Sequence, residues 1–347
     1  MSSILRKTAV IDGSNIREIT AELTCRTEPL ILKGLVKHWP LVQKGLQSDE
    51  TAIEYLKSHY NGKPAGVYMG EPEIKGRFAY DESVTKLNFS NKKSQLDEML
   101  DAVLLNKMAT SPQSLYVASN RINLHFPSLT TENTLPFNDN AFLGLSDKDA
   151  ELIASIWIGN KTLVSCHFDA QSNLACCVAG KRRFTLFPPD QINNLYPGPL
   201  EPTPGGQVIS MVDFNQPDLV KYPRFKAAIE AGQIAEMEQG DALFLPSMWW
   251  HQVEALEQFN ILVNYWWNTT APFRGQATDV LTHALLSIRD CPPQEKQAWK
   301  AIFDYYIFAD SKHAASHLPE AAHGALGEIE PLLARRLRAQ LLNKLNR

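Results

Sequence analysis

Two segments decide the fold: HFDAQSNLACCVAGKRRFTLFPP (167–189) and GDALFLPSMWWHQVEAL (240–256), the second followed by NILVNYWW (260–267). Each consists of short apolar runs separated by Gly, Pro, Asn or Asp, a pattern typical of short strands joined by turns. Similar runs recur from about residue 114 to residue 267. Many short strands at close spacing predict a β-sandwich or a β-barrel.

Helical patterns flank this β-rich region. IREITAEL (16–23) predicts a short helix, EPLILKGLV (28–36) a buried strand and TAIEYLKSHY (51–60) a second helix. QVISMVDF (207–214) predicts a further strand, and apolar residues at three- and four-residue spacing after position 271 predict helices. We therefore expect a mainly β protein with flanking helices in three parts: an α/β shoulder that packs on the core (1–110), a β domain (111–270) and a helical segment (271–347).

Composition limits the function classes. The 347 residues are 44% hydrophobic and 21% charged, as in ordinary globular proteins, and 34 basic against 38 acidic residues give a net charge of -4. A nucleic-acid partner is therefore unexpected, because such proteins usually carry a basic excess. No apolar run approaches the roughly 18 residues of a membrane helix. The start of the sequence lacks a secretory pattern, and five Cys without a CxxC pair indicate reduced thiols, so we expect a cytoplasmic protein.

The residues with the clearest chemistry are His167, Asp169 and His251. Residues i and i+2 of a strand project from the same face, so His167 and Asp169 converge. His251 follows the turn in GDALFLPSMWWH (240–251) and opens the strand after it. Two His and one carboxylate suit non-haem Fe(II), because they leave three coordination positions open, whereas zinc usually takes a fourth protein ligand. The HxD pattern alone is weak evidence. Its position before the two later segments, in this order, strengthens the prediction of a metal triad.

The ordered segments resemble the JmjC-type, cupin-like Fe(II)/2-oxoglutarate-dependent hydroxylases, and among them the asparaginyl hydroxylases that act on hypoxia-inducible factor. The resemblance covers about residues 20–45 and 110–267. It implies a double-stranded β-helix, or jelly roll, with Fe(II) held by His167, Asp169 and His251. It also implies that O2 and 2-oxoglutarate are consumed, the latter by oxidative decarboxylation to succinate, while a substrate is hydroxylated.

The same resemblance implies a set of cosubstrate residues. Ungapped alignment from His167 places Arg182 where the family usually has a lysine that binds 2-oxoglutarate, and Lys181 is the alternative cation if the register shifts by one. An arginine can hold a carboxylate with two hydrogen bonds, although its shape differs from that of lysine. Three more residues match family positions near the metal or cosubstrate: Tyr116, Asn173 and Asn264.

Two departures from the family leave a second function open. Arg182 replaces a lysine, and Val164 stands where the family often has a threonine. If these changes abolish 2-oxoglutarate binding, the chain is a metal-binding cupin without oxygenase activity, such as an isomerase or a ligand sensor. A third alternative is a non-catalytic scaffold, for which metal removal has no functional effect.

The sequence supports only general expectations about the substrate and the partners. We expect a protein or peptide side chain as substrate, with a small molecule as the alternative. The segment 207–214 is apolar where the asparaginyl hydroxylases carry a polar and basic pair, so their particular substrate is not transferred. Apolar stripes at 299–308 and 333–345 predict a homodimer through the C-terminal helices. The four Trp residues 249, 250, 266 and 267 are expected to pack in the core and at the barrel mouth.

Overall fold

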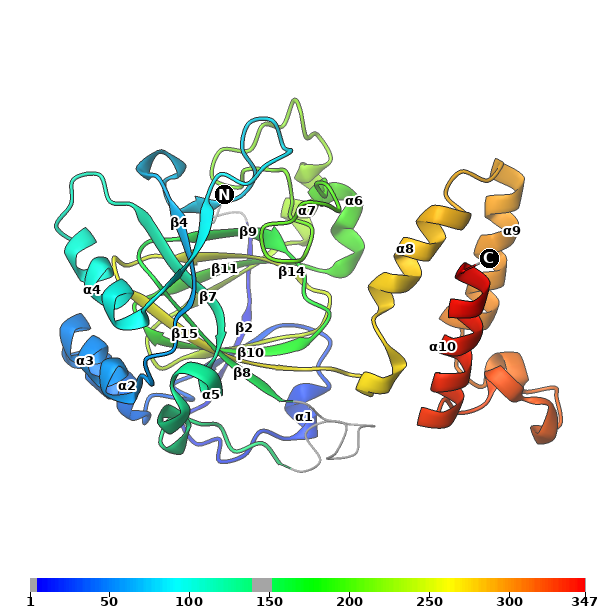
Figure 1. Cartoon of the computed structure of the whole chain (residues 1–347), viewed down its shortest axis with the longest axis horizontal. Helices are drawn as coiled ribbons and strands as arrows, with labels where there is room; N and C mark the ends of the chain where they lie inside the picture. The colour runs from blue at the N-terminus through cyan, green and yellow to red at the C-terminus, as the bar shows by residue number, and fades with distance from the viewer. Residues whose placement is uncertain (1–4, 139–151, 347) are drawn as a thin grey trace. The chain divides into compact units, whose positions relative to one another are not determined.

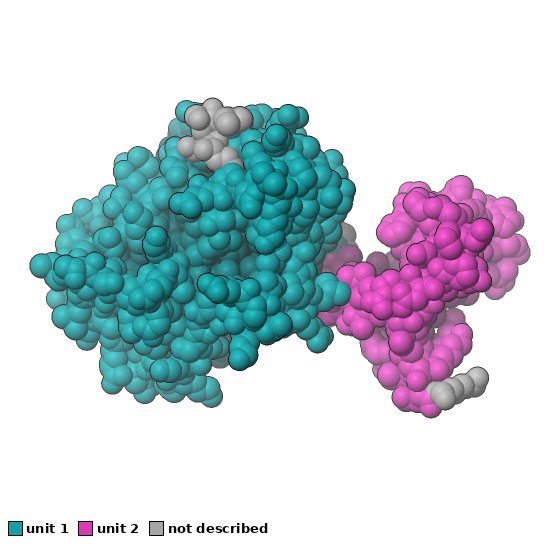
Figure 2. Space-filling model, turned by 90° about the horizontal axis from the view of Figure 1, so that it is seen from above, with its two compact units in different colours: residues 1–269 teal, residues 270–347 magenta. Residues whose placement is uncertain are grey.

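The computed structural model describes residues 5–138 and 152–346. The chain divides into two compact units, residues 1–269 and residues 270–347 (Figure 2). Within the described residues, the first unit contains all the strands and the second contains only helices and their connections. This division lies one residue from the expected boundary between the β domain and the helical segment.

Eight antiparallel strands form the centre of the first unit. One sheet contains the neighbouring strands β12-β11-β14-β9, and the other contains β13-β10-β15-β8. Two such four-stranded groups form a double-stranded β-helix, so the predicted jelly-roll core is confirmed. The strands are β8 (Ile153–Gly159), β9 (Leu163–His167), β10 (Ser172–Ala179), β11 (Arg182–Phe187), β12 (Gln233–Met237), β13 (Ala242–Leu245), β14 (Trp250–Ala255) and β15 (Asn260–Trp267).

Strands that precede β8 in the chain extend both sheets. The six-stranded sheet gains β1 (Arg6–Lys7) and β5 (Arg77–Phe78) at its edges. The nine-stranded sheet gains β2 (Ala9–Asp12), β3 (Leu30–Lys33), β4 (Ala65–Gly70), β6 (Ser90–Ser94) and β7 (Ser114–Arg121). The first 110 residues therefore supply strands to the sheets as well as the helices that cover them, which shields core edges that would otherwise be unpaired.

Helices cover the outer faces of the sheets (Figure 1). Helices α2 (Pro40–Gln47), α3 (Asp49–His59) and α4 (Leu96–Asn106) bury Leu41, Ile53 and Leu100 in one cluster with residues of the nine-stranded sheet. On the six-stranded sheet, Phe225 of α7 (Phe225–Ala231) packs with Cys166 and Trp250. The remaining short helices of this unit are α1 (Ala21–Thr24), α5 (Ile122–His125) and α6 (Ile192–Leu195).

Two local predictions were wrong. The helix expected over 16–23 is reduced to Ala21–Thr24, because Ile19 forms a β-bridge with Phe137 and holds the preceding chain extended. The strand expected over 207–214 is absent, and the segment makes only a bridge between Ser210 and Pro197. Its apolar residues are instead buried in loop clusters, where Val212 and Phe214 pack on the outer face of the six-stranded sheet.

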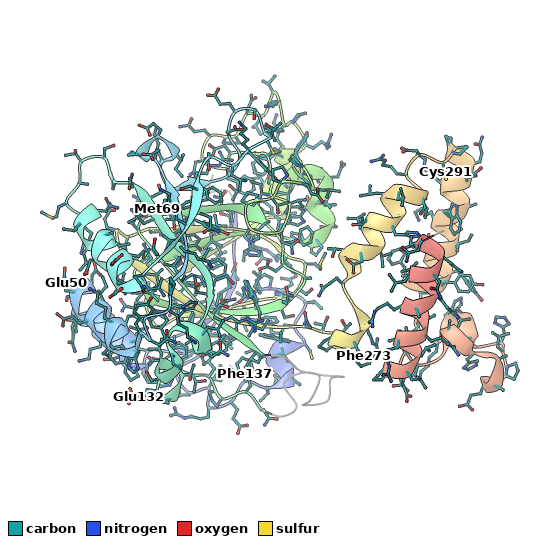
Figure 3. All side chains as sticks on the ribbon, in the orientation of Figure 1. Glu50, Met69, Glu132, Phe137, Phe273 and Cys291 are labelled. Atoms are coloured by element: carbon teal, nitrogen blue, oxygen red, sulfur yellow. The ribbon has the colours of Figure 1, made fainter. Side chains whose placement is uncertain are left out.

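The second unit is helical, as predicted. It contains α8 (Ala277–Ser287), α9 (Pro293–Phe303), a π-helical turn (Asp304–Phe308) and α10 (Pro331–Leu345). Arg338 of α10 donates a 2.7 Å hydrogen bond to the carbonyl of Phe273, which is labelled in Figure 3. None of the helices in the described part of the chain combines the length and the apolar character needed to span a bilayer.

A buried carboxylate organises the turn that leads into β13. Gly240 adopts a φ of 97°, a region that favours glycine, and Asp241 follows it. The Asp241 carboxylate is 4% exposed and accepts hydrogen bonds from Lys33 Nζ (2.7 Å), the Gly34 amide (3.0 Å) and the Glu238 amide (2.9 Å). It therefore ties the β12–β13 turn to the end of β3.

We predict that Asp241→Ala lowers the free energy of unfolding by about 1–3 kcal/mol, because it leaves two backbone amides and an ammonium group without their acceptor. Urea denaturation followed by circular dichroism measures the change. Asp190→Ala, at an exposed position, is the control and should stay within about 0.5 kcal/mol of the parent. Equal effects of the two substitutions would contradict the role given to Asp241.

Candidate metal centre

The three predicted metal-binding residues lie together at one end of the jelly roll. His167 is the last residue of β9, and its register partner on β14 is His251, so the two rings face each other with centroids 4.3 Å apart. Asp169 follows β9 by two residues, and its Oδ2 lies 3.7 Å from His251 Nε2. One potential ligand atom from each residue lies within 4.8 Å of the others, and this is the one such group of His, Cys, Asp or Glu among the described residues.

Backbone hydrogen bonds orient both imidazoles. His167 Nδ1 lies 2.8 Å from the Ser165 carbonyl, and His251 Nδ1 lies 2.9 Å from the Trp249 carbonyl. Because a carbonyl oxygen only accepts, each Nδ1 carries the proton and each Nε2 presents its lone pair. Burial, with a further contribution from His167, lowers the pKa of His251 to about 4, so this imidazole is neutral at neutral pH.

Contacts behind the triad hold the Asp169 loop. The amide of Met248 donates to the Asp169 carbonyl (2.8 Å), and Met248 has a φ of 67°, a strained value for a residue with a side chain. Ser247 Oγ donates to the next carbonyl, that of Ala170 (2.7 Å). The Phe168 ring packs edge-to-face on Trp250, with centroids 4.9 Å apart. The segment that precedes His251 therefore also positions Asp169.

A small inner cavity of about 50 Å³ extends from the triad into the barrel. Arg182 lines it and is 1% exposed, yet its Nε and one terminal nitrogen (NH2) have no hydrogen-bond partner in the part of the chain that the structure describes. No carboxylate among the described residues pairs with Arg182. A buried guanidinium with unpartnered nitrogens is costly unless it meets an anion. The inner cavity is therefore suited to a carboxylate.

Strand alternation decides which cation faces the cavity. Gly180, with a φ of 73°, begins the turn into β11, and a Cβ there would lie 2.3 Å from Asn260 Oδ1. After this turn Arg182 points inward, whereas Arg183 points outward to Glu236 and Glu254. The Lys181 side chain is 54% exposed, 4.0 Å from Glu238. Lys181 does not join the site, because the register that buries Arg182 leaves Lys181 in the turn.

The other expected cosubstrate residues line the inner cavity as a polar chain. Trp157 Nε1 donates to Asn264 Oδ1 (2.7 Å), and Asn264 Nδ2 donates to Asn173 Oδ1 (3.4 Å). Tyr116 lies beside Arg182, and burial raises the pKa of its hydroxyl to about 12 against the opposing effect of Arg182. The hydroxyl is therefore protonated at neutral pH and is able to donate a hydrogen bond.

An outer cavity of about 290 Å³ shares His167, Asp169 and Val164 with the inner one. Sequence analysis missed two residues that line both cavities, Trp157 and Trp266. Trp266 was expected to pack, but its buried Nε1 has no hydrogen-bond partner within residues 5–138 and 152–346. The sequence NYWW (264–267) contained a signal for this position. Residues i and i+2 of a strand share a face, so Trp266 lies on the same face as Asn264, which was expected to line the site. A larger cavity of about 500 Å³, which includes Ser172, contains no triad residue, so size alone does not locate the site.

Comparisons with known proteins agree with this geometry. A model of the cupin-like domain matches residues 16–272. Lysine-specific demethylase 8 of Xenopus tropicalis is 26% identical over 245 residues, which cover 70% of this chain and 48% of that protein. JmjC domain-containing protein D of Dictyostelium discoideum is 26% identical over 253 residues, covering 70% and 52% respectively. HSPB1-associated protein 1 of Bos taurus is 23% identical over 307 residues, covering 83% and 59%.

The chain spans about half the length of these relatives, so their complete activities are not transferred with the match. The family itself is established, because the matched region covers most of the chain and coincides with the jelly-roll unit. The more specific resemblance to asparaginyl hydroxylases stays a prediction. This chain therefore belongs to the family of cupin-like domains of the JmjC type.

Proposed function

We propose that the protein is an Fe(II)- and 2-oxoglutarate-dependent dioxygenase that hydroxylates a side chain of a protein or peptide. The observation that carries the proposal is Arg182, a buried cation with unpartnered nitrogens in the cavity behind the triad. A metal site alone is compatible with many functions, so it does not identify an oxygenase. The two together fit a dicarboxylic cosubstrate held between a metal and a cation.

The donor set fits ferrous iron. Two imidazoles and one carboxylate converge from β9, its following loop and β14. This set is the facial triad of non-haem iron oxygenases, which leaves three metal positions for other ligands. Zinc would more often take a fourth protein ligand, and the described residues offer no further Cys, His or acid in the group.

The inner cavity fits the far end of 2-oxoglutarate. Arg182 would hold the carboxylate remote from the metal, and the Tyr116 hydroxyl beside it would donate a further hydrogen bond. Asn173 and Asn264 line the same cavity. Val164 contributes only apolar surface where the family often has a hydroxyl, so Arg182 and Tyr116 carry the anchoring.

When bound, Fe(II) and 2-oxoglutarate together supply the oxidising power that inserts an atom of O2 into a C–H bond. The protein binds and orients. The two Nδ1 hydrogen bonds fix the rings, Met248 and Ser247 fix the Asp169 loop, and the apolar walls of the outer cavity limit water around the reacting carbon.

The names of the relatives leave the final product open between hydroxylation and demethylation. Two of the curated relatives are named lysine-specific demethylases. Oxygen insertion into an N-methyl group gives an unstable aminol that loses formaldehyde, so demethylation begins with the same chemical step. We propose stable hydroxylation as the default outcome.

We predict that Arg182→Met weakens 2-oxoglutarate binding by about 100-fold, the loss expected when a charge-assisted pair worth about 3 kcal/mol is removed. The measurement is an anaerobic titration of the Fe(II)-loaded protein, followed by the visible charge-transfer band of a chelated keto acid. Arg183→Met is the matched control, because it removes the same group from the opposite face of β11.

His167→Ala in the same titration should abolish the band by removing a metal ligand. If Fe(II) binds to the parent protein but 2-oxoglutarate produces no band, the oxygenase proposal is wrong and a metal-binding cupin without oxygenase activity takes its place. Equal affinities of the Arg182→Met and Arg183→Met variants would show that Arg182 does not hold the cosubstrate.

Thermal stability provides an independent prediction. Without 2-oxoglutarate, Arg182→Met should not lower Tm, because it removes a buried charge that has no anionic partner. At 100 times Kd, 2-oxoglutarate should raise the Tm of the parent protein by about 5 °C, from about 2.7 kcal/mol of binding stabilisation. The same concentration only equals the Kd expected for the variant, so it should raise the variant's Tm by less than about 1 °C. Differential scanning fluorimetry with a redox-inactive metal in place of iron makes both measurements.

The C-terminal unit supports a second proposal, a homodimer through its helices. Its exposed large apolar side chains include Trp299, Ile302, Phe308, Leu341, Leu342 and Leu345. Side chains of this kind gathered on one small unit are typical of an association surface. Leu333 and Leu337 of the expected stripe are half-buried within the unit, so Leu341 and Leu345 are the members most available to a second copy.

We predict that Leu341→Arg converts a dimer to a monomer, because it places a charge in the apolar contact. Light scattering coupled to size-exclusion chromatography gives the mass. Val220→Arg is the control, since Val220 is 93% exposed in the first unit and should not affect assembly. A monomeric parent protein would remove the proposal.

A further inference from the structure

The outer cavity is bounded by a continuous series of aromatic rings. Successive ring centroids are 4.8 Å (Tyr68–Phe89), 5.1 Å (Phe89–Phe78), 5.6 Å (Phe78–Tyr116), 5.9 Å (Tyr116–Trp157) and 5.7 Å (Trp157–Trp266) apart. All six rings line the cavity. They come from strands and connections spread over residues 68–266, so the fold, rather than one local motif, assembles this aromatic belt.

The cavity offers almost no charge to an occupant. Among the described lining residues, the charged group is Asp169, and the only imidazole is that of His167. Both belong to the proposed metal site, so the Asp169 charge is committed to the metal. No lysine or arginine of the described residues lines the cavity, which leaves a phosphate or carboxylate without a partner among them.

A cationic occupant is also disfavoured on magnitude. Each aromatic face attracts a desolvated cation by about 2 kcal/mol, so several faces together give a multiple of that value. Burying an ammonium group away from water, with the Asp169 carboxylate committed to the metal, costs up to tens of kcal/mol in a dry site, which exceeds the attraction of several faces. An uncharged apolar or aromatic group has no such cost and gains both burial and ring contacts, which are worth about 0.5–1.5 kcal/mol for each aromatic pair.

Uncharged polar groups at the same cavity are available to a polypeptide backbone. Ser119, Gln171 and Gln207 line the cavity, are half-buried and have no side-chain hydrogen bond within the described residues. Amide and hydroxyl groups suit peptide N–H and C=O groups, since they both donate and accept. The aromatic belt is thus suited to an apolar side chain of a polypeptide, and the three polar side chains are suited to its backbone.

Ser119 occupies a strained position that aims it at this cavity. Its φ is 48°, and it lies in a bulge where the register of β7 against β8 shifts between Val117 and Asn120. Bulges re-aim side chains beside functional sites, and a left-handed conformation outside glycine persists where the surroundings impose it. Here the bulge turns a free hydroxyl toward the space in front of the triad.

We infer that the outer cavity receives an uncharged apolar or aromatic side chain of a polypeptide, with Phe89 and Ser119 as specificity-determining residues. This inference rests on the proposed function and names its substrate class. At about 290 Å³ the cavity is just below the roughly 300–1,000 Å³ typical of ligand pockets, a size suited to one side chain rather than a folded surface.

The test uses blocked pentapeptides, acetyl-Gly-Gly-X-Gly-Gly-amide, with X as Phe, Leu, trimethyl-lysine or Glu. Each is titrated anaerobically into the full-length protein loaded with Fe(II) and 2-oxoglutarate. The readouts are the shift of the charge-transfer band and, separately, the Kd from calorimetry. We expect the Phe and Leu peptides to bind at least about tenfold more tightly than the other two. Tighter binding of the trimethyl-lysine or Glu peptide would overturn the inference.

Variants locate the binding. Phe89 is half-buried and contacts no triad residue or Arg182 in the ring series, so Phe89→Asn should weaken Phe-peptide binding at least about tenfold and leave the band without peptide intact. Phe89→Leu should restore most of the affinity. Leu105→Asn, at a position 75% exposed on α4, is the control. Equal behaviour of Phe89→Asn and Leu105→Asn would contradict the assignment.

Ser119→Gly distinguishes the contribution of the hydroxyl to peptide binding from any effect on the stability of the fold. Glycine adopts a φ of 48° without strain, so the variant should have a Tm equal to or above that of the parent, while peptide affinity falls. Unchanged affinity would remove Ser119 from the site. If the band is absent before any peptide is added, the proposed function fails instead, and calorimetry with the peptides still reports on the cavity.

Discussion

The antiparallel pairing of β9 with β14 is the constraint on which the site depends. This pairing places His167 and His251 directly opposite each other. The two proposed ligands are 84 positions apart in the sequence, yet the register of the two strands alone brings them together. The sequence Asp169–Ala170 leaves β9 at the same end, where Met248 and Ser247, just before β14, hold its carbonyls. A shift of one residue in this pairing would turn one imidazole to the other face of the sheet.

The same alternation explains why some of the site could be predicted and some could not. His167 and Asp169 were accessible because two residues on one strand face are fixed by local geometry, and His251 because an ordered set of motifs surrounds it. The role of Trp157 could not be predicted, because an aromatic residue in an apolar strand looks the same in the sequence whether it packs in the core or lines a cavity. Its role depends on Asn264, a residue of the neighbouring strand. Ser119 depends on a bulge, which the pattern SLYVASNR does not indicate.

The wrong strand over 207–214 has a related cause. Its apolar residues do become buried, but as loop residues: Val212 and Phe214 pack with Trp250 on the outer face of the six-stranded sheet, and Ile209 packs with Tyr80. A pattern of apolar residues predicts that a segment is buried, but it does not by itself show whether the buried segment forms a strand or a loop. The edge strands of the N-terminal region were difficult for the opposite reason, since β1, β2 and β6 are largely exposed and show no apolar alternation.

Arg182 and Ser119 show how stability and function oppose each other at one end of this barrel. Both are unfavourable in the isolated protein: one is a buried cation without an anion, and the other is a non-glycine residue at a positive φ. The surrounding sheets, buried on both faces, supply the stability that tolerates them. Each unfavourable feature faces a different cavity, and the two cavities meet at the triad. The fold therefore maintains, next to the proposed metal, one cavity lined by a buried cation and one lined mainly by aromatic rings.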